Sequence, residues 1–293
     1  MNSIWIILIG TLVASACSIL GCFLILRRMA MLGDGISHAI LPGIVIAFLI
    51  SGSRDATSML IGAMLVGLLT TFVIQWFKHH HVHADAALSI TFTALFAIGI
   101  ILISLYTRQI DLDLDCVLYG EIAYAHWDTW QLGGYEMGPR ALWMVGGTFL
   151  LNLILILLFY KQLKLTTFDP AFAAAIGIPV SFFHYLLMGM VSLTTVASFE
   201  SVGAILVVAM LIVPAATAYL WTDRLAHMLS LSILIGTLSA IGGFLLAIVI
   251  DASIAGSMTV MAGLLFFLSF LFAPQHGLIR KWHKYKRWYS KPQ

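Results

Sequence analysis

Charged residues are scarce in this sequence. Only 10% of its 293 residues are Asp, Glu, Lys or Arg, while 61% are hydrophobic, and the mean hydropathy is +1.02. Soluble domains contain about 25% charged and about 45–50% apolar residues, so this composition excludes an ordinary soluble globular protein. The formal net charge of +2 offers no general attraction for nucleic acid, and we expect no nucleic-acid partner.

Cysteine and several enzyme motifs are also missing or rare. Cys17, Cys22 and Cys116 are too few for a disulfide framework, and we interpret them as packing residues. The sequence contains no GxxxxGK[ST] loop, no HExxH and no GxSxG. These absences remove a P-loop ATP site and the main signals of a zinc protease or serine hydrolase, so we expect no enzymatic activity in this chain.

Long apolar runs fill the chain instead. A helix that crosses a bilayer needs about 20 mostly apolar residues. We therefore predict an all-α polytopic membrane protein, a single transmembrane domain over residues 1–293, with nine spans: 4–26, 36–50, 57–77, 86–106, 141–160, 181–199, 202–220, 227–249 and 257–273. The second span is short and contains Pro42, so eight spans remain possible if it is re-entrant.

The basic residues predict the orientation. With the N-terminus outside and the C-terminus inside, all of the 15 Lys and Arg residues except Arg54, Arg108 and Arg140 fall in inward segments, as the positive-inside rule requires. Residues 275–293 then form a basic cytoplasmic tail. Residues 107–140 form an extracellular interfacial segment, for which we predict short helices and an acidic rim.

One pair of ionisable residues lies in a predicted span. Asp34 and His38 are four residues apart, so on a helix they share one face. Ionisable residues inside a membrane are costly and are functional candidates by default. A carboxylate and an imidazole together suit manganese, zinc or iron better than Na⁺ or K⁺. The alternative is that the two side chains bond only to each other or to the backbone and bind no ion.

The residues around this pair predict a discontinuous helix. Gly33 and Gly35 would allow an unwound start, Ser37 adjoins the same face, and Pro42-Gly43 would break the backbone again. Broken helices of this kind line substrate pathways at membrane depth. Glu200, between two apolar runs, is a candidate second ligand or gate; the alternative is a solvated turn.

Residues 165–179 predict a short cytoplasmic helix between two spans. Asp169 can cap its N-terminus with Pro170 in first position, the alanines up to Ala175 favour helix, and Gly177 can end it. Phe172 and Ile176 are four residues apart and form one apolar face. That face could enter a groove on another protein or pack against this chain's own membrane domain.

Three segments in this order, residues 33–43, 168–179 and 200–218, closely resemble the membrane permease subunits of bacterial manganese, zinc and iron ABC importers, and the resemblance covers nearly the whole chain. It implies a location in the bacterial plasma membrane, with Asp34, His38 and, less directly, Glu200 as metal ligands. The implied cargo is Mn²⁺, with Zn²⁺ or Fe²⁺ next, and no permanent cofactor.

The resemblance also implies partners. They are a pair of ATP-binding cassette ATPase subunits that dock on Asp169–Gly177 as a coupling helix, an extracellular metal-binding lipoprotein, and a second permease copy or a paralogue. The competing hypothesis is an ion-coupled secondary cation transporter without an ATPase, in which Asp34, His38 and Glu200 would form a proton relay.

Overall fold

The structure, a computed structural model, describes residues 2–52, 56–106, 122, 129–132 and 135–274. Within these residues nine segments are long and apolar enough to cross a membrane, which confirms the predicted nine spans. The helices are α1 (Asn2–Leu26), α2 (Met31–Ala39), α3 (Leu41–Ser51), α4 (Ala56–His79), α5 (Ala84–Tyr106), α7 (Arg140–Leu158), α8 (Tyr160–Phe168), α9 (Pro170–Ala175), α10 (Val180–Val202), α11 (Ala204–Trp221), α12 (Leu225–Ile250) and α13 (Ile254–Phe272).

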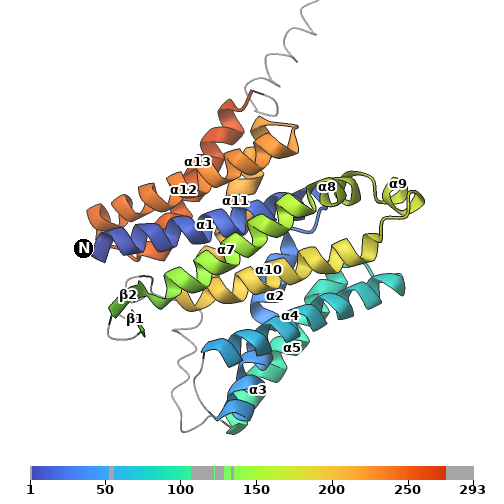
Figure 1. Cartoon of the computed structure of the whole chain (residues 1–293), viewed down its shortest axis with the longest axis horizontal. Coiled ribbons are helices and arrows are strands. Elements are labelled where there is room, and N and C mark those ends of the chain that lie inside the picture. Colours follow the sequence, from blue (N-terminus) through green and yellow to red (C-terminus); the bar gives the residue numbers. More distant parts are fainter. Residues whose placement is uncertain (1, 53–55, 107–121, 123–128, 133–134, 275–293) are drawn as a thin grey trace, which may run out of the picture.

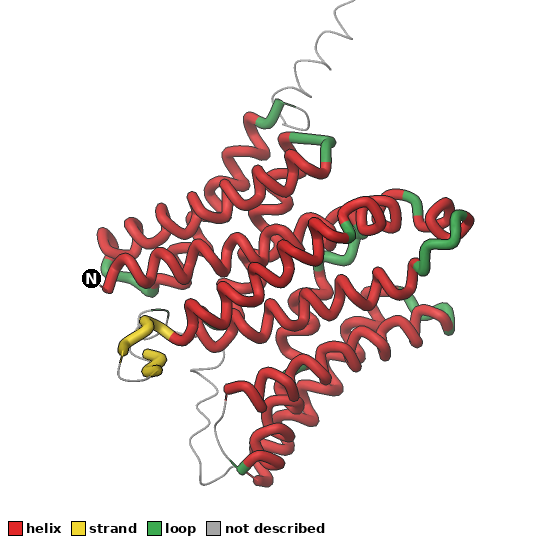
Figure 2. The backbone as a smooth tube through the Cα atoms, in the orientation of Figure 1, coloured by secondary structure: helices red, strands yellow, loops and turns green. Residues whose placement is uncertain are grey.

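The long helices lie side by side and form one bundle, with short elements at its two ends (Figure 1). Helix α9 projects from one end, which we call the α9 end. Two short strands, β1 (Thr129–Leu132) and β2 (Tyr135–Pro139), lie at the opposite end with the N-terminus, which we call the hairpin end (Figure 2). The second span is made of α2 and α3 together, so it begins at Met31 rather than at residue 36.

Helix α1 forms the centre of the bundle. It contacts α7, α10, α11 and α12, and Ile9, Leu20 and Phe23 are completely buried. A helix that is apolar on every side can be covered by other helices or by lipid, and α1 is covered by other helices. Cys17 and Cys22 are free thiols buried in the same helix, in agreement with a packing role; Cys116 lies outside the described residues.

Helices α3 and α4 approach each other through two glycines. A Cβ atom placed on Gly43 would collide with the backbone oxygen of Gly62, and one placed on Gly62 would collide with that of Gly43. The two backbones are therefore in direct contact, with no side chain between them. This contact fixes α3 against α4 and explains why both positions carry glycine.

The segment 107–140 differs from the prediction where it is described. Residues Thr129–Leu132 and Tyr135–Pro139 pair as an antiparallel hairpin, with Gln131 opposite Glu136, so the expected short helices are wrong for these residues. The two glycines between the strands, Gly133 and Gly134, are typical of a two-residue hairpin loop. The rest of this segment and the predicted basic tail 275–293 lie outside the described residues.

Candidate metal-binding site and coupling helix

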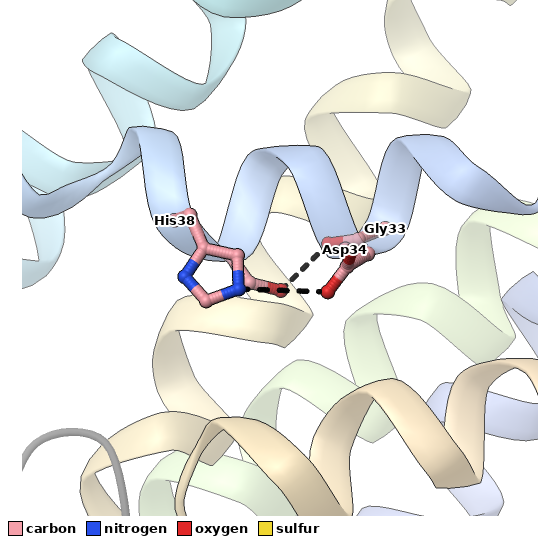
Figure 3. A network of polar contacts seen from close by, with 4 residues as sticks. Gly33, Asp34 and His38 are labelled. Carbon is pink, nitrogen blue, oxygen red and sulfur yellow. Dashed lines mark hydrogen bonds and ion pairs between the residues drawn. The ribbon is translucent and has the colours of Figure 1, made fainter. Parts of the chain in front are cut away.

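Helix α2 places Asp34 and His38 on one face, as the four-residue spacing predicts. The His38 Nε2 atom lies 3.6 Å from the Asp34 Oδ1 atom (Figure 3). Both side chains remain partly accessible, with 35% of His38 and 47% of Asp34 exposed. The two atoms therefore face each other at a place that a solute can reach.

The distance between these two atoms fits a shared divalent ion. Zinc bonds to imidazole nitrogen and carboxylate oxygen are about 2.0–2.2 Å long, so an ion bound to both would hold the atoms about 3.0–3.5 Å apart. The observed 3.6 Å needs only a small side-chain adjustment to reach that range. It is also longer than an ordinary hydrogen bond, so the alternative that the pair merely satisfies itself is the weaker one.

A cavity of about 490 Å³ opens beside the pair. Among the described residues that line it, Asp34 and His38 are the polar ones, and the other six are apolar residues of α11: Ala204, Ile205, Val208, Ala209, Ile212 and Val213. Six waters occupy about 180 Å³ of liquid volume. The cavity can therefore admit an ion together with its hydration shell before any ligand exchange.

One copy of the chain offers few ligands here. Among the residues that the structure describes, no group of three or more His, Cys, Asp or Glu side chains could hold a metal ion. The aliphatic wall on α11 adds no donor atom. One copy of the chain thus offers two candidate ligands, and an ion bound here would need its other donor atoms from water or from a second chain.

Two aromatic rings of α5 support the imidazole. The Phe96 ring meets His38 edge to face at 5.7 Å between centroids, and the Phe92 ring lies 6.2 Å away at a tilt. Aromatic pairs in such arrangements stabilise by about 0.5–1.5 kcal/mol beyond their buried area. Phe92 and Phe96 hold the ring of His38 beside Asp34. The residues around Asp34 do not predict this contact; the only sequence signal is that Phe92 and Phe96 are four residues apart and so share one face of α5.

The glycines before His38 do not unwind the helix. Gly33 and Gly35 lie inside α2, so the predicted unwound start is wrong. A Cβ on Gly33 would collide with Leu211, and one on Gly35 would press on Leu88. Both glycines therefore serve close packing of α2 against α11 and α5. Ser37 is buried, and its Oγ donates to the Gly33 carbonyl at 2.7 Å.

The predicted break at Pro42 is present. Helix α2 ends at Ala39 and α3 begins at Leu41, with Pro42 and Gly43 in its first turn. Proline has no N–H, so the His38 carbonyl, four residues earlier, loses the donor that a continuous helix would provide. The span is discontinuous directly after the residue pair that faces the cavity.

The other candidate ligands do not join this pair. The backbone at position 200 belongs to α10, but the Glu200 side chain lies outside what the structure describes. Residues 79–83, where α4 ends and α5 follows, contain four histidines. His80 Nδ1 is 3.0 Å from the Trp76 carbonyl oxygen, and the described histidines of this segment form no group of three ligands.

Helix α9 matches its predicted ends. The Asp169 Oδ1 atom accepts a hydrogen bond from the Phe172 N–H at 2.9 Å, with Pro170 as the first residue. Gly177 closes the helix with φ +84°, a conformation that favours glycine. Phe172 and Ile176 are 53% and 54% exposed. The described part of the chain therefore does not cover this apolar face, which we call the α9 face.

Comparison with known proteins agrees with these features. Residues 2–273 match the family model described as the ABC 3 transport family. The chain is 52% identical over 277 residues to the manganese transport system membrane protein MntD of Bacillus subtilis, with 94% of each chain covered. It is 41% identical to the zinc transport system membrane protein TroD of Treponema pallidum, covering 94% of this chain and 75% of the relative.

A solved structure shows the same fold. PsaBC from Streptococcus pneumoniae, in complex with Fab, matches with a TM-score of 0.79 and 34% identity over 94% of both chains. With nine apolar helices and these bacterial relatives, the chain is a multi-pass protein of the bacterial plasma membrane. The resemblance found in the sequence is confirmed: the chain belongs to the ABC 3 transport family.

Proposed function

We propose that this chain is the membrane permease subunit of an ATP-driven importer of divalent transition metal ions, with manganese as its main substrate. The Asp34/His38 pair beside an open cavity carries the proposal. Manganese accepts oxygen and imidazole ligands, and a relative that is 52% identical bears the name of a manganese transport protein. Zinc, named for another relative, is the second candidate substrate.

Two permease chains, either two copies or a copy and a paralogue, form the pathway. Two copies facing each other bring two carboxylates and two imidazoles to one ion. The two Asp34 carboxylates then balance the ion's double positive charge, which lowers the cost of holding it inside the membrane. The aliphatic wall on α11 adds no further ligand, so the ion is held loosely enough to leave.

The hairpin end faces outward and the α9 end faces the cytoplasm in this proposal. Basic residues at the α9 end support this orientation: Arg27 follows α1, Lys78 lies in the last turn of α4, and Lys164 lies in α8. An extracellular metal-binding lipoprotein delivers the ion at the hairpin end. Glu200, near the end of α10, serves there as a second ligand on the way in.

The energy comes from a partner, because the sequence has no P-loop of its own. A pair of ATPase subunits receives the α9 face, with Phe172 and Ile176 as anchors, in a helix-in-groove contact. An exposed apolar face outside the membrane spans supports this reading.

Metal content of cells tests the proposal. Cells lacking this chain are complemented with wild type, Asp34→Ala, His38→Ala or, as the matched control, Ser37→Ala, and manganese, zinc and iron are measured in parallel. We expect wild type and Ser37→Ala to restore manganese and the two ligand variants to fail while still assembling. Normal manganese uptake in both ligand variants would refute the site, and proton-driven uptake by this chain alone in proteoliposomes would favour the secondary transporter.

A further inference from the structure

A short, well-defined turn connects α1 to the helix that carries the ligand pair. Helix α1 ends at Leu26, and only residues 27–30 precede α2. Arg28 adopts the left-handed conformation with φ +57°, and the Met29 N–H donates to the Leu24 carbonyl at 2.8 Å. This is the hydrogen-bonding pattern that ends many helices. The direction in which α2 leaves α1 is therefore set by this turn.

Arg27, the first residue of the turn, is bonded to another helix. Its Nε donates to the Thr167 Oγ1 at 3.1 Å, and its Nη2 donates to the Thr166 Oγ1 at 3.0 Å. Both threonine hydroxyls in turn donate to the Leu163 carbonyl, at 3.2 and 2.6 Å. Their lone pairs are thereby directed toward the guanidinium. The side chain of Arg27 therefore connects the end of α1 to α8 by two hydrogen bonds.

The charged guanidinium of Arg27 is partly buried. Burial lowers the pKa of its guanidinium to about 10, and its side-chain hydrogen bonds run to two threonine hydroxyls. Buried charges are normally paired with an opposite charge. Here the acceptors are two neutral hydroxyls, so the contact can be broken and remade more easily than an ion pair.

The position of this contact relates it to both functional parts of the chain. Thr166 and Thr167 lie in the last turn of α8, and α9 begins at Pro170. On the other side, Asp34 lies in the first turn of α2, a few residues after Arg27. Figure 1 shows α8 and α9 next to each other at one end of the bundle, and α8 contacts α1.

We propose that Arg27 is a positioning residue that transmits movement of α8 and α9 to α2, and so to Asp34 and His38. The inference rests on the proposed function, in which an ATPase moves α9. When α8 shifts, the two hydrogen bonds pull Arg27 in the same direction, and residues 27–30 move with it. The orientation of α2 beside the cavity changes as a result, and Asp34 and His38 turn toward the cavity or away from it.

The test uses the assembled transporter with its ATPase subunits and binding lipoprotein in proteoliposomes, where Mn²⁺ uptake and ATP hydrolysis are measured together. Thr166→Val with Thr167→Val removes both acceptors and keeps the side-chain shape. We expect the ATPase to bind as in wild type, and Mn²⁺ moved per ATP to fall at least about tenfold, because about tenfold corresponds to the loss of one charged hydrogen bond and this variant removes two. Arg28→Met, which removes the neighbouring exposed charge, is the matched control and should leave this ratio unchanged.

A triple variant separates transmission from a structural role. Adding Arg27→Met to the two valines removes the partly buried charge that has lost its two acceptors, so a structural role predicts restored transport, whereas transmission predicts that the loss remains. Restored transport, an unchanged ratio in the double variant, or an equal loss in Arg28→Met would each overturn the inference. If wild type itself showed no ATP-driven uptake, the proposed function would fail and the inference with it.

Discussion

Replacing Phe172 by alanine should weaken ATPase binding by a calculable amount. A phenylalanine buries about 200 Å² when fully covered, and 53% of Phe172 is exposed. Covering that area, about 100 Å², stabilises a complex by about 2.5 kcal/mol at 25 cal/mol per Å². Alanine keeps the Cβ, so the expected loss is about 2 kcal/mol, equivalent to roughly 30-fold weaker binding.

The assay is a titration of the ATPase subunit onto the purified permease in lipid nanodiscs, together with its ATP turnover. Phe267→Ala is the matched control, because Phe267 has a similar exposed fraction, 58%, but lies in the membrane span α13. We expect Phe172→Ala to lower the affinity about 30-fold, and Phe172→Asp to lower it further, since a buried unpaired charge is costly.

The reasoning would be refuted by binding of Phe172→Ala within about twofold of wild type, or by the same loss in Phe267→Ala. The first result would mean that the α9 face stays exposed in the complex. The second would mean that the loss reflects general damage to the protein and not a contact made by α9.

Three further predictions concern the site and the packing. Phe96→Leu removes the edge-to-face contact with His38, so the Mn²⁺ concentration for half-maximal uptake should rise about two- to tenfold with the maximal rate retained, as initial rates across a metal series would show. Gly62→Ala forces a Cβ onto the backbone of α3 and should cost about 1–3 kcal/mol in thermal unfolding, whereas Gly147→Ala, which meets open space, should cost nothing. Asp169→Ala removes the α9 cap and should cost about 1 kcal/mol of helix stability, measured as about fivefold weaker ATPase binding.

The features that sequence predicted are those set by local spacing. Asp34 and His38 meet because residues four apart share a helix face, and Asp169 caps α9 because a short carboxylate before Pro170 reaches the free N–H groups. The nine spans follow from hydrophobic length alone. Each of these depends on residues close together in the chain, so no knowledge of the tertiary fold was needed.

The features that sequence did not predict come from contacts between distant segments. The α11 wall of the cavity and the rings of Phe92 and Phe96 reach the site only through packing. Gly33 and Gly35 were interpreted as helix breakers because glycine weakens isolated helices, whereas here they allow Leu211 and Leu88 to come close. Glycine serves both purposes, and only the neighbouring helices decide between them.

The break at Ile40 divides the second span into two pieces with different mechanical freedom. One piece, α3, packs against α4 backbone to backbone at Gly43 and Gly62, so no flexible side chain lies between the two helices to adjust. The other piece, α2, contacts its neighbours at Gly33 and Gly35 through the flexible ends of leucine side chains. Ile40 therefore separates a piece whose close contacts are backbone to backbone from one whose close contacts are side chains, and a change in the tilt of α2 would require less rearrangement of neighbouring atoms than a change in the tilt of α3.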